Sequence, residues 1–290
     1  MTTPAILKKS DAPATAAAGL RDLVVHVDDG AETEGRVAFA AAFARAQGAH
    51  LVAVATQTPP YIPAAVRAEV GETFFEAWRK TNAAATARQA ERAAVAGRAE
   101  GVEIEFRTVE GQPEDTLLVH ARHADLTILS QATGPAAPEQ TRTIEALLFG
   151  SGRPILLVPA AGRYTAPGRH VLVAWNGSRE AARAVADAMP VLQRAQHVTV
   201  LSADPAGAAR RVPGADIALH LARHGVKVAT STTYAGDIGI GDALLNRATD
   251  LGADMLVMGG YGHSRTREAI FGGATRHVLE HMTLPVFMSH

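Results

Sequence analysis

The chain carries one pattern of five short apolar runs twice, in the same order. The first copy comprises LVVHVD at 23–28, AHLVAVA at 49–55, GVEIEF at 101–106, ADLTILS at 124–130 and RPILLVP at 153–159. The second copy comprises VLVAWN at 171–176, QHVTVLS at 196–202, GVKVAT at 225–230, ADMLVMG at 253–259 and LPVFMSH at 284–290. Apolar runs of this length predict buried strands. A repeat of this kind dictates the architecture, so we expect two copies of one five-stranded domain.

The segments between these runs are helical in pattern. Apolar residues recur at three- and four-residue spacings in four of them, at 36–47, 115–123, 179–192 and 242–251. Ser178 stands immediately before the third of these segments and is the predicted N-cap. Strands that are apolar throughout and alternate with helices predict an α/β fold with a parallel sheet covered on both faces.

The repeat divides the chain into two domains. We expect an N-terminal domain at 21–160 and a C-terminal domain at 169–290, joined by a linker at 161–168. Residues 1–20 are expected to be a disordered leader. The linker boundary rests on the Gly- and Pro-containing sequence that separates the two copies.

The first copy is longer than the second between its first and fourth strands. The additional residues predict a helical insertion at 57–100, with a long Ala/Arg/Glu-rich helix over 66–99. Phe74, Phe75 and Trp78 in this helix could form a contact surface or pack into a core. The pattern favours core packing.

Composition narrows the classes of function. The 290 residues are 47% hydrophobic and 20% charged, and the net charge is −1, which argues against a large electrostatic footprint for nucleic acid. The absence of cysteine excludes disulfides, thiolate zinc sites and cysteine nucleophiles. No apolar run approaches the ~20 residues of a transmembrane helix, and the N-terminus lacks a signal-peptide pattern. We expect a cytoplasmic protein that binds neither nucleic acid nor membrane.

A glycine-rich block follows the fourth strand of the second copy. Gly259 and Gly262 are followed by Gly272, just before another helical pattern. Glycine permits positive φ and lets a ligand approach the backbone closely. A helix N-terminus behind such a loop offers unpaired N–H donors to a phosphate. The block therefore predicts a phosphate-binding loop.

The paired halves and the spacing Gly259-x2-Gly262-x9-Gly272 resemble the universal stress protein family in its tandem two-domain form. The segments WNGSREAARAV at 175–185 and GGYGHSRTREAIFGG at 259–273 carry most of this resemblance. It implies two doubly wound, five-stranded parallel-sheet domains of the adenine nucleotide alpha hydrolase-like type, with strand order 3-2-1-4-5. In such sheets ligands bind beyond the carboxyl ends of the strands, where the strand order reverses.

The resemblance also implies which residues of the second half would hold a nucleotide. ATP is the expected ligand, with AMP and ADP left open. Strand one would contribute Trp175 and Asn176, and the loop and following helix would contribute Gly259, Gly262, His263, Gly272, Gly273 and Thr275.

Two of these positions depart from the family pattern. Gly273 stands where ATP-binding members have Ser or Thr, and Asn176 stands where Asp is frequent. A missing hydroxyl removes one hydrogen bond, worth about 1.5–3 kcal/mol when the acceptor is charged. Backbone donors remain, and Thr275 could partly substitute.

The first half is less suited to a nucleotide. Its fourth strand ends in Ser130 and continues as QATGPAAPEQT, without a Gly-x2-Gly motif. The GSG at 150–152 precedes strand five and predicts a turn there. Asp28 keeps the strand-one carboxylate, and His26 is expected to be a core histidine with a satisfied partner. We expect this half to be degenerate as a nucleotide site.

Other motifs have plainer explanations. HVLEH at 277–281 fits an H-x-x-E-H zinc pattern, but a third ligand is not evident, so a histidine-containing helix is favoured. Ser264 lies in GHSRT, which lacks the last glycine of a nucleophile elbow, and no GxxxxGK[ST] motif occurs. His263 and Arg265 could contact phosphate or be solvated loop residues.

These patterns predict a cytoplasmic stress-response regulator or protective protein that is not an enzyme, with slow ATP hydrolysis left open. It would bind an adenine nucleotide in its C-terminal half and act through a protein partner that the sequence does not identify. Its two domains are expected to pack through their fifth strands as an intrachain pseudo-dimer, and a homodimer is a further option. The alternative is a nucleotide-free interaction scaffold that uses the same fold and the insertion at 57–100.

Overall fold

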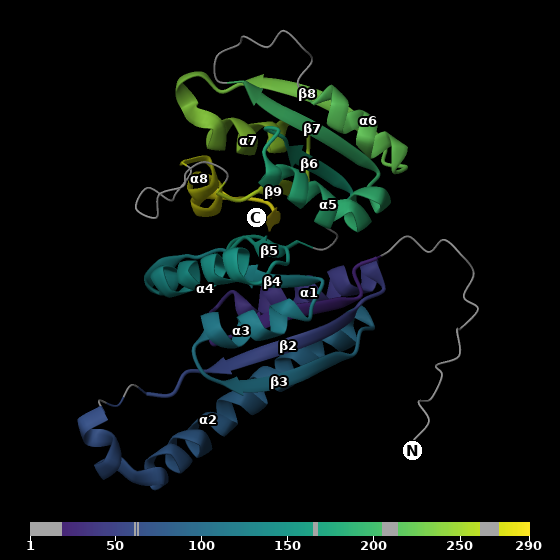
Figure 1. The fold of residues 1–290 in the computed structure, drawn as a ribbon. Coiled ribbons are helices and arrows are strands. Elements are labelled where there is room, and N and C mark those ends of the chain that lie inside the picture. The colour runs from purple at the N-terminus through teal and green to yellow at the C-terminus, as the bar shows by residue number, and fades with distance from the viewer. Residues whose placement is uncertain (1–18, 61, 63, 165–167, 205–213, 262–272) are drawn as a thin grey trace, which may run out of the picture.

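The computed structural model forms one ten-stranded sheet that runs through both halves of the chain (Figure 1). It describes residues 19–60, 62, 64–164, 168–204, 214–261 and 273–290. Within these residues the sheet order is β3-β2-β1-β4-β5-β10-β9-β6-β7-β8. Each half therefore has the predicted order 3-2-1-4-5. The fifth strands of the two halves are neighbours, so the order of the second half runs 5-4-1-2-3 across the sheet.

All ten strands expected from the repeat are present. Those of the first half are β1 (Asp22–Val27), β2 (His50–Gln57), β3 (Ile104–Glu110), β4 (Leu126–Ser130) and β5 (Ile155–Val158). Those of the second half are β6 (His170–Ala174), β7 (His197–Asp204), β8 (Val228–Tyr234), β9 (Met255–Gly259) and β10 (Val286–Ser289). Pairing is parallel within each half. The predicted doubly wound α/β fold is confirmed.

The two halves join through their fifth strands, as the sequence predicted. β5 and β10 pair antiparallel, with Phe287 opposite Leu156. This pairing hydrogen-bonds two strands that would otherwise be exposed edges. The two similar halves of one chain thus pair as an intrachain pseudo-dimer.

Helices cover both faces of the sheet. They are α1 (Thr33–Gln47), α2 (Ala64–Glu100), α3 (Pro113–Arg122), α4 (Ala137–Gly150), α5 (Arg179–Arg194), α6 (Ala215–Arg223), α7 (Gly239–Asp250) and α8 (Gly273–His281), with short 3₁₀ turns at Gly134–Ala136 and Gly236–Ile238. One buried cluster packs α1, α2, α5 and α6 on one face, and a second packs α3, α4, α7 and α8 on the other. Alternate residues of each strand enter the two clusters, as strand geometry requires.

Ser178 caps α5, as predicted. Its backbone is extended and its Oγ accepts a hydrogen bond from the Ala181 amide at 3.1 Å. The predicted turn before strand five is also present, because α4 ends at Gly150 and β5 begins at Ile155, with Gly152 at φ +68° between them.

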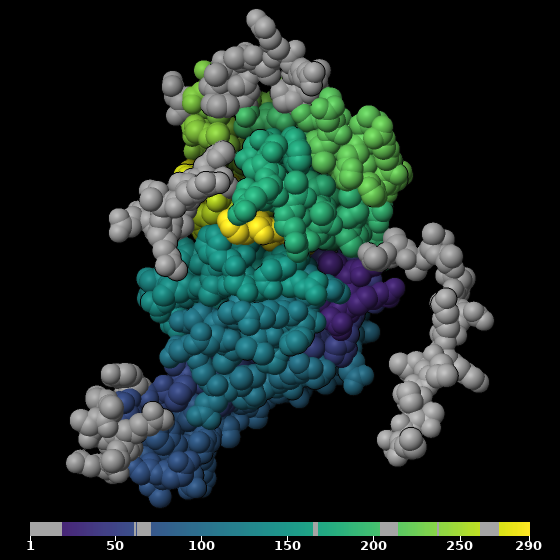
Figure 2. Space-filling model, in the orientation of Figure 1, coloured from purple at the N-terminus to yellow at the C-terminus, as the bar shows by residue number. Residues whose placement is uncertain are grey.

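The long helix α2 projects from the body of the first half (Figures 1 and 2). Its C-terminal part packs against α1 and β3. Gly71 interrupts it with φ 65° and ψ 168°, so it consists of two helices rather than the single one expected. The favoured core position is wrong for Phe74, which is 41% exposed and meets Phe75 edge to face. In the described part of the chain, no helix combines the length and apolarity needed to cross a membrane.

Candidate functional site

The sheet has two places where its strand order reverses, one in each half. In the first half β1 lies between β2 and β4, and in the second β6 lies between β7 and β9. Chain segments leave neighbouring strands in opposite directions at such points, which opens a crevice beyond their carboxyl ends. The predicted site residues of the second half that the structure describes lie at the β6–β9 position.

Trp175 and Asn176 follow β6 directly. The Trp175 amide donates to the Leu201 carbonyl at 2.8 Å, and its ring packs against the buried cluster that contains α5. The Asn176 Oδ1 atom accepts from the Ser178 amide at 3.0 Å. This Asx turn uses the side-chain oxygen to start α5, so the amide nitrogen of Asn176 is the part left to meet a ligand.

Gly259 ends β9 against the first turn of α5. A Cβ atom at this position would lie 2.5 Å from the Ala181 nitrogen and 2.5 Å from the Glu180 carbonyl carbon. Backbone atoms cannot yield as the end of a side chain can, so only glycine fits. The plainer interpretation of the glycine, close packing, therefore applies at this first position of the motif.

The predicted loop begins at Tyr261, whose backbone is left-handed with φ 56°. A bulky side chain in this region is uncommon, and such strain collects at functional sites. The Tyr261 amide donates to the Thr275 Oγ1 atom at 3.3 Å, which joins the start of the loop to helix α8. Thr275 is buried, whereas Gly273 is exposed at the first turn of α8. Thr275 thus holds the loop ends together.

Three predicted site residues, Gly262, His263 and Gly272, lie outside the described residues, as do Ser264 and Arg265. Residues 1–18 of the expected leader and residues 165–167 of the expected linker do so as well. The structure thus places Trp175, Asn176 and Gly259 at the ends of the paired strands β6 and β9, with Thr275 bonded to the nearby Tyr261, without describing the loop between them.

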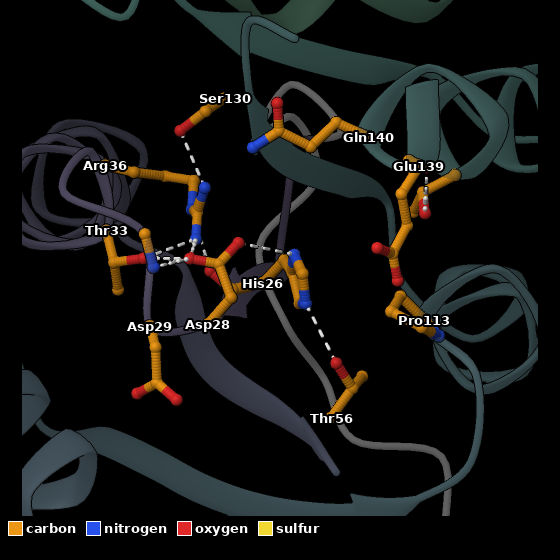
Figure 3. A network of polar contacts seen from close by, with 12 residues as sticks. His26, Asp28, Asp29, Thr33, Arg36, Thr56, Pro113, Ser130, Glu139 and Gln140 are labelled. Atoms are coloured by element: carbon orange, nitrogen blue, oxygen red, sulfur yellow. Dashed lines mark hydrogen bonds and ion pairs between the residues drawn. The ribbon is translucent and has the colours of Figure 1, made fainter. Parts of the chain in front are cut away.

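A polar cavity occupies the reversal point of the first half, where the sequence predicted a degenerate site. Its volume is about 280 Å³. The ends of β1, β2 and β4 line one part of it, and the starts of α3 and α4 line another (Figure 3). Such cavities are frequently where small molecules bind.

Arg36 organises one wall of this cavity from α1. It is 3% exposed, and its Nη2 atom lies 3.1 Å from the Asp28 Oδ1 atom. Its Nη1 atom donates to the Ser130 hydroxyl oxygen at 2.6 Å, and its Nε atom donates to the His26 carbonyl at 2.8 Å. Thr33 bridges the ion pair between Arg36 and Asp28, because its hydroxyl donates to Asp28 Oδ1 and accepts from Arg36 Nη2. A buried guanidinium needs such partners on every side.

His26 lies between Asp28 and Thr56 (Figure 3). It is 8% exposed, and its Nε2 atom lies 3.1 Å from the Thr56 hydroxyl oxygen. Burial and the neighbouring Arg36 guanidinium lower the pKa of His26 to about 4, against a smaller opposing effect of Asp28. His26 is therefore neutral at physiological pH and has the satisfied partner that the sequence predicted, but it also lines the cavity.

Asp28 keeps its negative charge in the same network. Burial alone would raise its pKa, but Arg36, His26, Thr33 and the Gly30 amide together lower it to about 2. The Gly30 amide donates to Asp28 Oδ1 at 2.9 Å, the same Asx turn that Asn176 makes in the second half. Sequence reasoning identified Asp28 but missed Arg36 as its partner.

Helix α4 connects the two reversal points. Near its start, Glu139 and Gln140 line the first-half cavity. Near its end, the Phe149 ring lies 5.1 Å from that of Tyr261, and a Cβ atom on Gly260 would lie 2.7 Å from Leu148 Cδ2. Gln131, which follows β4, donates from Nε2 to the Leu279 and Glu280 carbonyls of α8. The first half thus directly supports the segments that flank the predicted loop.

The histidines of the H-x-x-E-H pattern make other contacts. His277 Nε2 lies 2.9 Å from Asp242 Oδ1, and His281 Nδ1 bonds to the His277 carbonyl. Across the described residues, no three His, Cys, Asp or Glu side chains are grouped so that they could hold a metal ion.

Comparison with solved structures supports the architecture. A universal stress protein from Archaeoglobus fulgidus DSM 4304 matches with a TM-score of 0.71 at 14% identity, covering 92% of this chain and 97% of that one. A protein of unknown function from Pseudomonas aeruginosa PAO1 matches with a TM-score of 0.56 at 16% identity, covering 93% and 92%. At these identities the likeness concerns the fold alone. No curated protein matches by sequence.

A family model decides the relationship. The model of the universal stress protein family matches this chain twice, at residues 19–151 and at residues 168–290. The first match includes β1 to β4, and the second includes β6 to β10, so each contains the reversal point of its half. The chain therefore belongs to the universal stress protein family, in its tandem two-domain form.

Proposed function

We propose that this protein is a stress-response regulator that binds an adenine nucleotide, ATP in the first place, at the reversal point of its C-terminal half. Trp175 and Asn176 would meet the base and ribose. The loop with Gly259, Gly262, His263, Gly272 and Gly273, together with Thr275, would surround the phosphates. The family membership makes an adenine nucleotide the natural candidate.

The observation that carries the proposal is the strained entrance to the loop. Tyr261 has a left-handed backbone directly after β9, beside the end of β6. Strain of this kind costs about 1–3 kcal/mol and persists where the surroundings demand it. Thr275 and Phe149 hold Tyr261 from two sides, between Gly259 and the later glycines of the motif.

The role we propose is nucleotide-dependent association with a protein partner in the cytoplasm, without turnover. The described residues around the second crevice include no paired nucleophile and base, which is the arrangement that efficient hydrolysis needs. The C-terminal domain at 169–290 would carry the nucleotide, and the domain at 21–160 would support it through α4. A homodimer of the tandem chain is compatible with this role.

The test is to identify what the full-length protein carries and what stabilises it. Mass spectrometry of ligands released on denaturation should detect adenine nucleotide. Added ATP should also raise the melting temperature, since a ligand at 100 times its Kd stabilises the folded state by about 2.7 kcal/mol, which amounts to several degrees.

Two valine variants locate the site. Gly262→Val should abolish the ATP-induced rise, because a branched side chain would block the close approach of the phosphates to the loop backbone. Gly35→Val is the matched control, since Gly35 is exposed on α1 and a Cβ there meets no described atom within 4 Å. If ATP stabilises the wild type and Gly262→Val equally, the site is misplaced. If neither nucleotide release nor stabilisation occurs, nucleotide binding is wrong.

One observation favours a second function, a nucleotide-free interaction scaffold. The N-terminal part of helix α2 projects from the body of the protein (Figure 1), and Phe74, near the break at Gly71, is exposed. A projecting aromatic side chain is typical of contact surfaces. A protein that releases no nucleotide and is not stabilised by ATP would favour this function over the first.

A further inference from the structure

We propose that the outer strand β8 is the interface of a homodimer, in which β8 of one chain pairs antiparallel with β8 of a second copy. The inference goes beyond the proposed function and does not depend on nucleotide binding. It rests on the difference between the outer strands of the two halves, on the backbone groups that β8 directs away from the sheet, and on the match of this strand with itself.

The four outer strands of the two halves differ in charge. β5 (ILLV) and β10 (VFMS) carry no charged residue, and they pair with each other. β3 (IEFRTVE) carries three charged residues and forms one end of the ten-stranded sheet. β8 (VATSTTY) carries none and forms the other end (Figure 1). An edge strand without charges or a covering element tends to pair with another strand. Two of the three uncharged outer strands already do so within the chain, and β8 is the third.

The edge at β3 has the protection that β8 lacks. Its Glu105 forms ion pairs with Arg107 at 2.7 Å and with His50 at 3.0 Å. Its last residue, Glu110, lies 3.5 Å from the Nε atom of Arg79 on helix α2, which packs against the same strand. A strand added at β3 would therefore meet charged side chains and a helix, which are devices that keep edges unpaired.

Part of the β8 backbone points away from the sheet. The Lys227 carbonyl, just before the strand, accepts from the Val198 amide of β7 at 3.0 Å. Successive residues of a strand direct their backbone groups to opposite sides. The residues that direct theirs to the free edge are therefore Val228, Thr230, Thr232 and Tyr234. Within the described part of the chain, β8 is hydrogen-bonded to β7 alone. These outward N–H and C=O groups are what an added strand needs.

The strand matches itself in an antiparallel pair. A two-fold axis at Ser231 brings all seven residues of β8 into the pair and sets outward-directed residues opposite one another, as an antiparallel ladder requires. Thr230 then lies opposite Thr232 of the second copy, and Val228 lies opposite Tyr234. Threonine pairs, and pairs of an aromatic with a β-branched residue, are favourable across strands. This match favours a second copy of the chain as the added strand.

The surroundings of the edge suit the same partner. Tyr234 is 67% exposed at the end of β8, and Ile238 and Ile240 are exposed just after it. A stable interface buries about 800 Å² per partner, and these side chains add apolar area to that of the strand pair. At the other end of β8, Lys227 meets Ala235 of the second copy in this register. No charged residue therefore lies opposite its own copy along the pair.

The experiment is sedimentation velocity of the full-length protein, without nucleotide, over a range of concentrations. The wild type should sediment with twice the mass of the 30.3 kDa chain. A wild type that stays monomeric at ~100 μM, where even a weak specific dimer is populated, would overturn the proposal. The edge would then be left to strands of other proteins. Because no nucleotide is present, a failure of the proposed ATP site does not alter these outcomes.

Two charged variants test whether the dimer forms at β8. Thr230 and Thr232 are exposed, so a charge at either is compatible with the folded chain. Thr232→Lys and Thr230→Glu should each raise the Kd of the dimer about tenfold, because each replaces both threonine pairs and sets two like charges diagonally across the axis. Thr108→Lys is the matched control, since Thr108 is exposed on β3 at the other end of the sheet and should leave the Kd unchanged. An unchanged Kd in both β8 variants, or an equal rise in Thr108→Lys, would contradict the interface.

A mixture of the two β8 variants tests the register. In a mixed dimer centred on Ser231, the introduced lysine of one chain lies directly opposite the introduced glutamate of the other, and one threonine pair is kept. An equimolar mixture of Thr232→Lys and Thr230→Glu should therefore associate with a Kd within about threefold of the wild type. A mixture that dissociates as readily as either variant alone would overturn the pairing of β8 with itself about Ser231.

Discussion

The two reversal points share strand order and parallel pairing, yet they hold different chemistry. In the first half α1 begins at Thr33, five positions after Asp28, and in the second half α5 begins at Arg179, three positions after Asn176. Both Asp28 and Asn176 make an Asx turn to the amide two residues on. The connection that precedes α1 is thus two residues longer than the connection that precedes α5.

The last residues of the two fourth strands, Ser130 of β4 and Gly259 of β9, also have different surroundings. Ser130 in the first half has room for its side chain and accepts from Arg36 at 2.6 Å. Gly259 in the second half has no room for a Cβ, because the first turn of α5 lies 2.5 Å from where it would be. The first half thus has a cavity beside the end of β4, whereas the end of β9 packs against the backbone of α5.

The largest expected effect comes from removing the organising cation of the first half. Arg36→Met should lower the free energy of unfolding by about 3 kcal/mol, because it leaves Asp28 without its counter-ion. A loss of this size is at the low end for a broken buried ion pair, because the Asp28 side chain is still 28% exposed. Urea unfolding at pH 7 of the wild type and the variant measures the loss.

A double variant and a second ion pair test whether the loss comes from leaving Asp28 without its counter-ion. Arg36→Met with Asp28→Asn should recover part of the loss, because no charge then remains uncompensated. Arg183→Met breaks the i,i+4 pair with Asp187 on α5, whose arginine is 49% exposed, and should cost less than about 1 kcal/mol. A loss at Arg36 no greater than that at Arg183 would remove the distinction between the two halves.

A smaller effect is expected from adding one methyl group to the second half. Gly259→Ala should cost about 2 kcal/mol, since the backbone of α5 must move to admit the Cβ. Gly35→Ala on α1 is the control, because that Cβ meets no described atom within 4 Å and alanine favours a helix. A melting temperature unchanged by Gly259→Ala would mean that the first turn of α5 can move away from residue 259 without cost, and the packing difference between the two halves would be wrong.

Much of the fold could be predicted because its signals are local. Each apolar run became a strand, Ser178 became the cap of α5, and the fifth strands paired because each would otherwise be an edge. The class and the strand order followed from the repeat and the family resemblance. Boundaries shifted by a few residues at several elements, such as β3 at Ile104–Glu110 instead of 101–106.

The candidate sites were harder to predict, because their partners are distant in the chain. Arg36 lies on a helix where arginine normally faces solvent, and its partner Ser130 is 94 positions away. Phe74 lies in an Ala-rich helix whose position relative to the sheet no local pattern determines. The predicted second-half residues share one crevice because they follow neighbouring strands, which is a consequence of topology.

The smallest effect is the pH dependence that His26 contributes to the first half. Its folded-state pKa of about 4 lies below the usual 6.5, so the unfolded chain binds a proton more readily. Stability from this group is therefore fully present above pH 6.5 and falls as the pH falls toward 4. Between pH 7 and pH 5.5 the loss should be about 1 kcal/mol.

His26→Gln should remove that part of the pH dependence, since Gln can still bond to Thr56 and does not titrate. The measurement is the difference in unfolding free energy between pH 7 and pH 5.5, compared with the wild type. Asp28, with a pKa of about 2, and Arg36 face His26 and keep their charges throughout this range.

Thr56→Ser, which keeps the hydroxyl partner, should retain the wild-type dependence. An unchanged slope in His26→Gln would show that His26 is not held neutral in the folded protein. The acid sensitivity would then belong to other histidines.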